Sequence, residues 1–141
     1  MKNNVNGKYS LGRNEIFIVK KEEENKLLLI PKSEKYAEYI IDLIIKLSRT
    51  EKFSIGNEYK SSLYKMLEKI MYINKMSKED KSKVIITLNE IDALLNTQRI
   101  YLRIMKKYKW IDEKKFNVAM NLIYEIGKIL GGLIKYYAKK N

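Results

Sequence analysis

The sequence lacks cysteine and histidine altogether. These absences exclude disulfide bonds, thiolate nucleophiles, imidazole general bases and the usual side-chain ligands of zinc. No pair of carboxylates has a spacing that would hold a metal ion or divide the roles of acid and base. Glu58 and Glu125 stand alone, and Glu125 is expected to pair with a nearby lysine or arginine. We therefore predict no catalytic residue, no metal site and no cofactor, and we expect a protein that is not an enzyme.

Long apolar runs are also missing, since no segment approaches the roughly 18 residues of a membrane-spanning helix. The best candidate, residues 126–134, is interrupted by Lys128 and three glycines. Residues 1–4 (Met-Lys-Asn-Asn) have no apolar core of a signal peptide. Without cysteine there are no disulfide bonds, so the fold does not depend on an oxidising compartment. We expect a cytoplasmic protein that makes no membrane contact.

Proline occurs once and glycine six times, and 45% of the residues are hydrophobic, which is typical of a folded helical domain. After Pro31 the apolar residues recur at steps of three and four, which predicts amphipathic helices. We expect one helix from Ser33 to an interruption at 54–57, one ending near Asn74, one over about 78–108 and one after Asp112. Four helices with short connections predict an all-α, antiparallel four-helix bundle over residues 32–141.

Residues 1–31 differ from this pattern and are interpreted as an N-terminal arm. Two short apolar runs, 16–19 and 27–30, flank a charged stretch, which favours a β-hairpin. Three polar residues are expected to cap helices at their first turns. They are Ser33, Ser77 and Asp112, each before one predicted helix. Gln98 interrupts an apolar seam, where it would either fix the packing register or lie at the rim of the core.

Acidic residues are scarce in the last third of the chain. Of the net charge of +12, residues 97–141 supply +8, from eleven basic and three acidic residues. Arg99 and Arg103 are one helical turn apart, and a guanidinium group binds two phosphate oxygens at once. The predicted nucleic-acid-binding residues are Arg99, Arg103, Lys106, Lys107, Lys128, Lys135, Lys139 and Lys140. A solvated basic face is the alternative, and compensation of the helix dipole would also account for the last two lysines.

Aromatic residues lie among these cations. Such rings can stack on unpaired bases, although tyrosine at the rim of a bundle is the more frequent role. The candidates are Tyr101, Tyr108, Tyr136 and Tyr137, whereas Trp110 is expected to help turn the chain. Gly127, Gly131 and Gly132 each cost a helix about 0.5–1 kcal/mol relative to alanine. Close packing within the monomer and a subunit interface would both explain these glycines.

Three segments together resemble a known family. They are residues 54–56 (Ser-Ile-Gly), 99–103 (Arg-Ile-Tyr-Leu-Arg) and, above all, 125–135 (Glu-Ile-Gly-Lys-Ile-Leu-Gly-Gly-Leu-Ile-Lys). They look like the four-helix bundle family of the accessory variability determinant (Avd-like) of diversity-generating retroelements. The proteins encoded in intervening sequences of large-subunit ribosomal RNA are more distantly similar. The resemblance covers roughly residues 33–138, so the N-terminal arm falls outside it.

The resemblance implies a barrel-like homopentamer that works with a reverse transcriptase and its template RNA during mutagenic reverse transcription. It also implies nucleic-acid contact at Arg99 and Arg103, and close packing at Gly127 and Gly131. We therefore predict a basic accessory protein that binds RNA or DNA. The alternative is a structural oligomerisation protein whose basic face docks an acidic protein partner.

Overall fold

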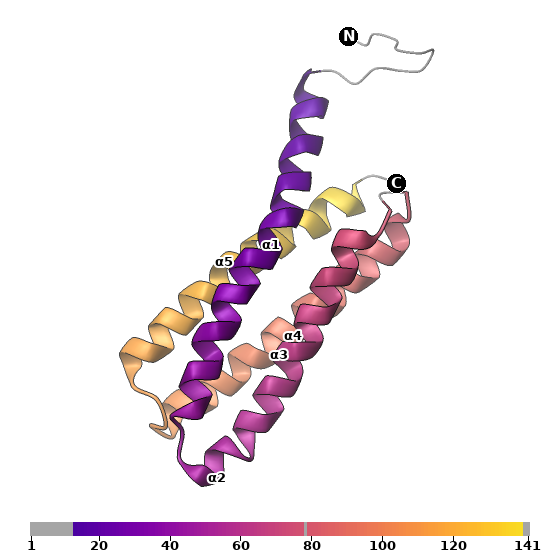
Figure 1. Ribbon diagram of the computed structural model, residues 1–141. Coiled ribbons are helices and arrows are strands. Elements are labelled where there is room, and N and C mark those ends of the chain that lie inside the picture. The colour runs from indigo at the N-terminus through magenta and orange to yellow at the C-terminus, as the bar shows by residue number, and fades with distance from the viewer. Residues whose placement is uncertain (1–12, 78, 140–141) are drawn as a thin grey trace.

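The computed structural model describes residues 13–77 and 79–139, with side chains from residue 21 onward. Four long helices make up most of it: α1 (Arg13–Ile45), α3 (Ile55–Lys75), α4 (Lys81–Lys107) and α5 (Glu113–Ala138). A one-turn helix, α2 (Arg49–Lys52), lies between α1 and α3. The long helices run side by side in alternating directions, and α1 extends past the others (Figure 1). The predicted antiparallel four-helix bundle is confirmed.

The bundle has a simple neighbour order. Helix α1 packs on α3 and α5, and α4 packs on the same two helices, so that α3 and α5 lie diagonally opposite each other. The core is built from buried leucine, isoleucine, methionine and tyrosine side chains of all four long helices. None of the described helices is long and apolar enough to cross a membrane.

The predicted β-hairpin is wrong. Residues 16–19 and 27–30 both lie in α1, which continues through Pro31, and the described part of the chain contains no strand. Buried positions recur at 26, 29, 33, 36 and 40, which is the helical period, but a lysine and a serine occupy two of them. Leu27 and Leu28 are exposed, so the apolar run that suggested a strand is only partly a core segment.

The start of the first bundle helix was therefore predicted too late. Ser33 does not cap a helix, because it lies inside α1, and its buried hydroxyl has no hydrogen-bond partner among the residues that the structure describes. Lys26, seven residues earlier, is buried against α5, where its Nζ donates to the Tyr137 Oη at 3.5 Å. The aliphatic stem of a lysine can cover apolar surface in this way. Residue 31 thus marks no break between an arm and the bundle.

The other helix ends follow the sequence more closely. Asp112 caps α5 as predicted, since its Oδ1 accepts from the Lys115 backbone N–H at 2.8 Å. The predicted cap at Ser77 is wrong, because α4 begins later, after Asp80, and the Ser77 hydroxyl instead accepts from the Glu79 N–H at 3.2 Å. Residues 55–57, predicted as an interruption, form the first turn of α3.

Gln98 lies in the core and not at its rim. Its side chain is fully buried in α4 and bonds to two other helices. The Tyr36 hydroxyl of α1 donates to Gln98 Oε1 at 2.8 Å, and Gln98 Nε2 donates to Ser62 Oγ of α3 at 3.1 Å. A polar residue that bonds to two neighbouring helices defines one alignment of the three, so Gln98 fixes packing register.

Candidate nucleic-acid interface

Basic side chains of α4 lie along its contact with α5. The guanidinium of Arg99 is 2.9 Å from the point where a Cβ on Gly127 would stand. Seven residues later, the Lys106 Nζ is 4.6 Å from the centre of the Phe116 ring. Arg103 is one turn from both and exposed, and Lys107 is one turn further on. We call these four cations, Arg99, Arg103, Lys106 and Lys107, the basic seam.

Carboxylates of the described chain do not neutralise the arginines of the basic seam. Neither arginine forms an ion pair with a carboxylate in the described part of the chain. Arg99 donates to the Asn96 side chain, and the Asn96 Nδ2 in turn donates to Asp92 Oδ2 at 3.3 Å. Glu125 pairs with Lys32 of α1 at 3.1 Å, which confirms its expected role as an ion-pair partner. That carboxylate is therefore engaged with α1 and not with the arginines.

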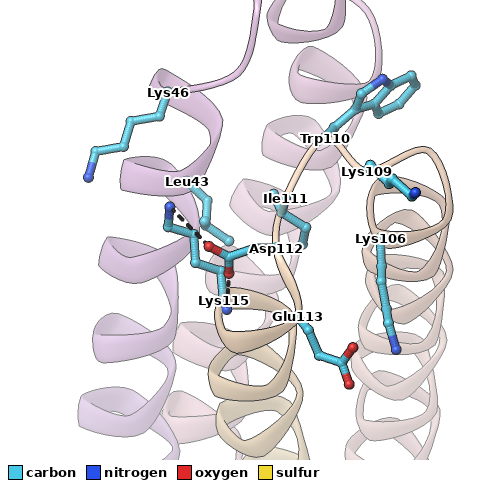
Figure 2. Close-up of a pocket in the computed structure, with 9 residues that line it drawn as sticks. All are labelled: Leu43, Lys46, Lys106, Lys109, Trp110, Ile111, Asp112, Glu113 and Lys115. Carbon is cyan, nitrogen blue, oxygen red and sulfur yellow. Dashed lines mark hydrogen bonds and ion pairs between the residues drawn. The ribbon is translucent and has the colours of Figure 1, made fainter.

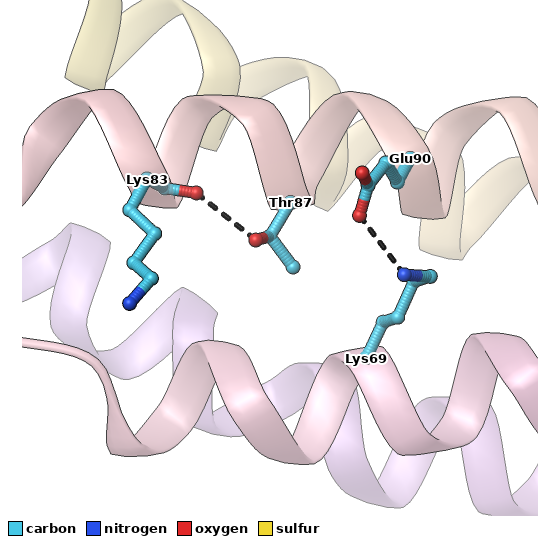
Figure 3. Close-up of polar contacts among 4 residues, drawn as sticks. All are labelled: Lys69, Lys83, Thr87 and Glu90. Atoms are coloured by element: carbon cyan, nitrogen blue, oxygen red, sulfur yellow. Dashed lines mark hydrogen bonds and ion pairs between the residues drawn. The ribbon is translucent and has the colours of Figure 1, made fainter.

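The opposite contact of α4, with α3, has a different character. There, Lys69 Nζ of α3 lies 2.9 Å from Glu90 Oε1 of α4, and the Thr87 hydroxyl bonds within α4 to the Lys83 carbonyl at 2.9 Å (Figure 3). Lys69 is thus paired with a carboxylate at this contact, whereas the arginines of α4 are not. Lys83 of α4 lies at the same contact without an ion pair among the described residues, so unpaired positive charge occurs on both sides of α4.

The eight predicted cations do not gather in one place. Lys128 follows Gly127 and is exposed, with its Nζ 5.7 Å from the centre of the Tyr124 ring, so it lies level with Arg99. Lys135 and Lys139 are also exposed, but α5 runs antiparallel to α4 and carries them toward the other end of the bundle. Eleven residues of helix separate Lys128 from Lys139, or about 16 Å. Lys140 lies outside the described residues.

The predicted tyrosine cluster is largely occupied in packing. Tyr137 is buried, and burial together with the nearby Glu23 carboxylate raises its pKa to about 12. Tyr136 packs edge-on against Tyr137, and Tyr101 lies 5.5 Å from the Tyr59 ring. Only Tyr108, among the four candidates, is an exposed ring. Stacking on bases by the other three is therefore not supported by their positions.

Sequence reasoning missed a group of residues where α4 turns into α5. An open pocket of about 480 Å³ lies there, next to the end of α1 (Figure 2). Its lining residues are Leu43, Lys46, Lys106, Lys109, Trp110, Ile111, Asp112, Glu113 and Lys115. The signal that could have revealed it is the run Lys-Lys-Tyr-Lys-Trp at 106–110, which alternates cations with aromatic rings.

The three glycines of α5 have different surroundings. Gly127 leaves room for the Arg99 side chain, so its close contact is with a cation of the same chain. A Cβ added to Gly131 or Gly132 would meet nothing within 4 Å. Close packing within the monomer therefore explains Gly127 but neither of the other two.

We expect Gly131→Ala to raise the free energy of unfolding by about 0.5–1 kcal/mol, because alanine favours the helix and its methyl group meets open space. Gly127→Ala should give a smaller gain or none, since Arg99 must move to admit the methyl group. Urea unfolding of both variants, at a concentration where gel filtration shows a monomer, measures the difference. A loss of stability in monomeric Gly131→Ala would contradict this expectation, whereas weaker self-association of that variant is the result that a subunit interface at this glycine predicts.

Comparisons with known proteins bear on the whole bundle. A family model described as bAvd-like matches residues 27–137, so the match begins inside the segment that the sequence had suggested was an arm. A similar solved structure is that of a protein of unknown function from the S23 ribosomal protein family of Bacteroides thetaiotaomicron. It has a TM-score of 0.70 and 18% identity, over 80% of this chain and 96% of that one. At this identity the likeness shows the fold alone. The comparison with curated proteins finds no match.

Proposed function

Since this chain belongs to the bAvd-like family, we propose that it is a nucleic-acid-binding accessory protein that acts with a reverse transcriptase and its template RNA in a diversity-generating retroelement. Membership supports an accessory role in such an element. The observation that carries the binding proposal is the basic seam, in which Arg99 lies against α5 and Arg103 is exposed one turn further on, both without a carboxylate partner among the described residues.

The proposed contact is electrostatic. Arg99, Arg103 and Lys107 repeat once per helical turn, so a cation follows about every 6 Å along α4. A line of cations binds the phosphate backbone and sets its orientation along α4. Such contacts do not distinguish one base sequence from another. Binding releases counterions from the nucleic acid, which makes affinity fall steeply with salt. We propose a role in binding without catalysis, consistent with a sequence that has no cysteine or histidine.

We also propose that the protein assembles into a homo-oligomer, a pentamer if the family resemblance holds in full. Two features support an assembly. Gly131 and Gly132 leave open space beside α5, where another helix could approach closely. Tyr64 and Met71, two turns apart on one side of α3, are exposed. Large apolar side chains grouped on one surface often mark a protein interface.

Salt dependence tests the binding proposal. We expect a labelled single-stranded RNA to bind at 50 mM salt and to lose about fifty-fold in affinity at 200 mM, as four phosphate contacts would require. Fluorescence anisotropy measures the dissociation constant at each salt concentration. A polyglutamate peptide, titrated at the same salt, tests the alternative function. Binding of the peptide without binding of RNA would favour a structural protein that docks an acidic partner.

A further inference from the structure

The turn between α4 and α5 presents two aromatic rings together. Tyr108 and Trp110 are stacked, with ring centroids 5.5 Å apart and planes inclined by 26°. Tyr108 is 61% exposed and Trp110 is 36% exposed. Tryptophan is usually highly buried in folded proteins, so an outward-facing tryptophan stacked on an exposed tyrosine is uncommon. We call this pair the aromatic platform.

The backbone of the turn holds the platform in place. Lys109 has φ of 62°, and its N–H bonds to the Lys106 carbonyl at 3.0 Å, while the Trp110 N–H bonds to the Met105 carbonyl at 2.9 Å. These two bonds and the left-handed residue form a Schellman helix end, in which glycine is the usual residue at the left-handed position. Here that position is a lysine, which costs free energy. The chain reverses at Lys109, and this brings the rings on either side of it together.

Lysines line the pocket beside the platform. In Figure 2, Lys109 lies beside Trp110 at the edge of the pocket, and Lys46 of α1 lies on the far side of the pocket with its ammonium group directed away from Trp110. Neither lysine forms an ion pair with a carboxylate of the described chain. Of the two pocket carboxylates, Asp112 is engaged by capping α5 and by Lys115 Nζ at 3.8 Å. The pocket therefore keeps an excess of unneutralised ammonium groups.

The platform continues the basic seam. Lys107 directly precedes Tyr108, and Lys106 belongs both to the seam and to the pocket. A phosphate backbone that follows α4 toward its carboxyl end would therefore arrive at the two rings. The seam alone would hold single and double strands alike, because both offer phosphates. Exposed rings at its end can stack only on bases that are unpaired.

We propose that Tyr108 and Trp110 form a stacking site for unpaired bases of a single-stranded nucleic acid, with Lys109 holding the adjacent phosphate. The inference rests on the proposed function and deepens it, because it states which form of nucleic acid the protein prefers. Stacking accepts every base, since each has a π-face, so the site adds affinity for single strands without sequence specificity.

Trp110 is the only tryptophan in the sequence, so its fluorescence reports on this site directly. We expect a 12-nucleotide oligouridylate to quench the emission of the wild-type chain at 50 mM salt. An abasic oligomer with the same phosphates, and an RNA duplex of the same length, should bind with little quenching. Polyglutamate, which carries charge but no rings, should not quench it at all.

A variant gives an independent measurement. Trp110→Leu should bind the oligouridylate about tenfold more weakly by anisotropy, while its affinity for the duplex changes less than about twofold. Tyr72→Leu is the control, because Tyr72 is an exposed aromatic residue on α3, away from the turn. The control should bind both ligands like the wild type. Circular dichroism of both variants verifies that the bundle is retained.

The results separate two kinds of failure. If the oligouridylate binds without quenching and Trp110→Leu binds it as tightly as the wild type, the stacking site is overturned and the proposed function stands. If polyglutamate quenches Trp110 as the oligouridylate does, the pocket recognises acidic chains in general, and the stacking site is again overturned. If no nucleic acid binds at 50 mM salt, the proposed function itself fails and this inference fails with it.

Discussion

Replacing Arg99 and Arg103 together with alanine should weaken the binding of single-stranded RNA by about a hundredfold at 50 mM salt. Neither guanidinium has a carboxylate partner among the described residues, so each can form a charged, two-pronged bond with a phosphate. Loss of about 1.4 kcal/mol at each position is a factor of ten. The slope of log affinity against log salt should also become shallower by about 1.4, because two phosphate contacts are lost. Anisotropy titrations over a range of salt concentrations measure both quantities.

A second double variant controls for net charge. Lys60→Ala with Lys65→Ala removes the same number of charges from α3, which lies diagonally across the bundle from α5. We expect it to bind RNA within about threefold of the wild type, because neither lysine belongs to the basic seam. Equal weakening in both double variants would show that only total charge matters, and the basic seam would then not be the binding site.

Conservative substitution separates charge from geometry. Arg99→Lys with Arg103→Lys keeps both charges but replaces two planar guanidinium groups with ammonium groups, which do not bond two phosphate oxygens in the same fixed arrangement. Its affinity should fall between those of the wild type and the alanine double variant. Full retention of affinity would mean that the contact is purely a matter of charge.

Periodicity predicted the bundle because the buried positions of α3, α4 and α5 are mostly apolar, with isolated polar exceptions such as Ser62 and Gln98. The early part of α1 was missed for a physical reason: two of its buried positions hold Lys26 and Ser33, and Pro31 resembles a helix stop. An interior proline is tolerated there because packing outweighs the hydrogen bond that it removes. A pattern that counts only apolar residues does not detect polar side chains that are buried, such as these two.

The candidate site was predictable only where it depends on a single helix. The positions of Arg99 and Arg103 relative to each other follow from the helical period. Their position relative to the lysines of α5 depends on how two antiparallel helices are aligned, and Gly127 beside Arg99 is the contact that reveals it. The aromatic platform could not be predicted in this way, because it depends on a left-handed lysine where glycine is usual.

The core holds a chain of hydrogen bonds with a defined direction. The Tyr36 hydroxyl donates to Gln98 at 2.8 Å, so the 2.7 Å bond between the Tyr36 and Tyr59 hydroxyls must be donated by Tyr59. Gln98 then donates to Ser62, whose hydroxyl donates to the Leu94 carbonyl at 3.5 Å. Burial raises the pKa of both phenols above the usual value, so both keep the proton that they donate.

This direction predicts unequal effects from two chemically identical deletions. Tyr36→Phe leaves the Tyr59 hydroxyl without an acceptor and Gln98 Oε1 without its donor, so we expect it to lower the free energy of unfolding by about 3 kcal/mol. Tyr59→Phe removes only the first donor of the chain and should cost about 1 kcal/mol. Urea unfolding at one protein concentration compares the two variants. Equal losses would contradict a directed chain and would indicate that the two hydroxyls exchange donor and acceptor roles.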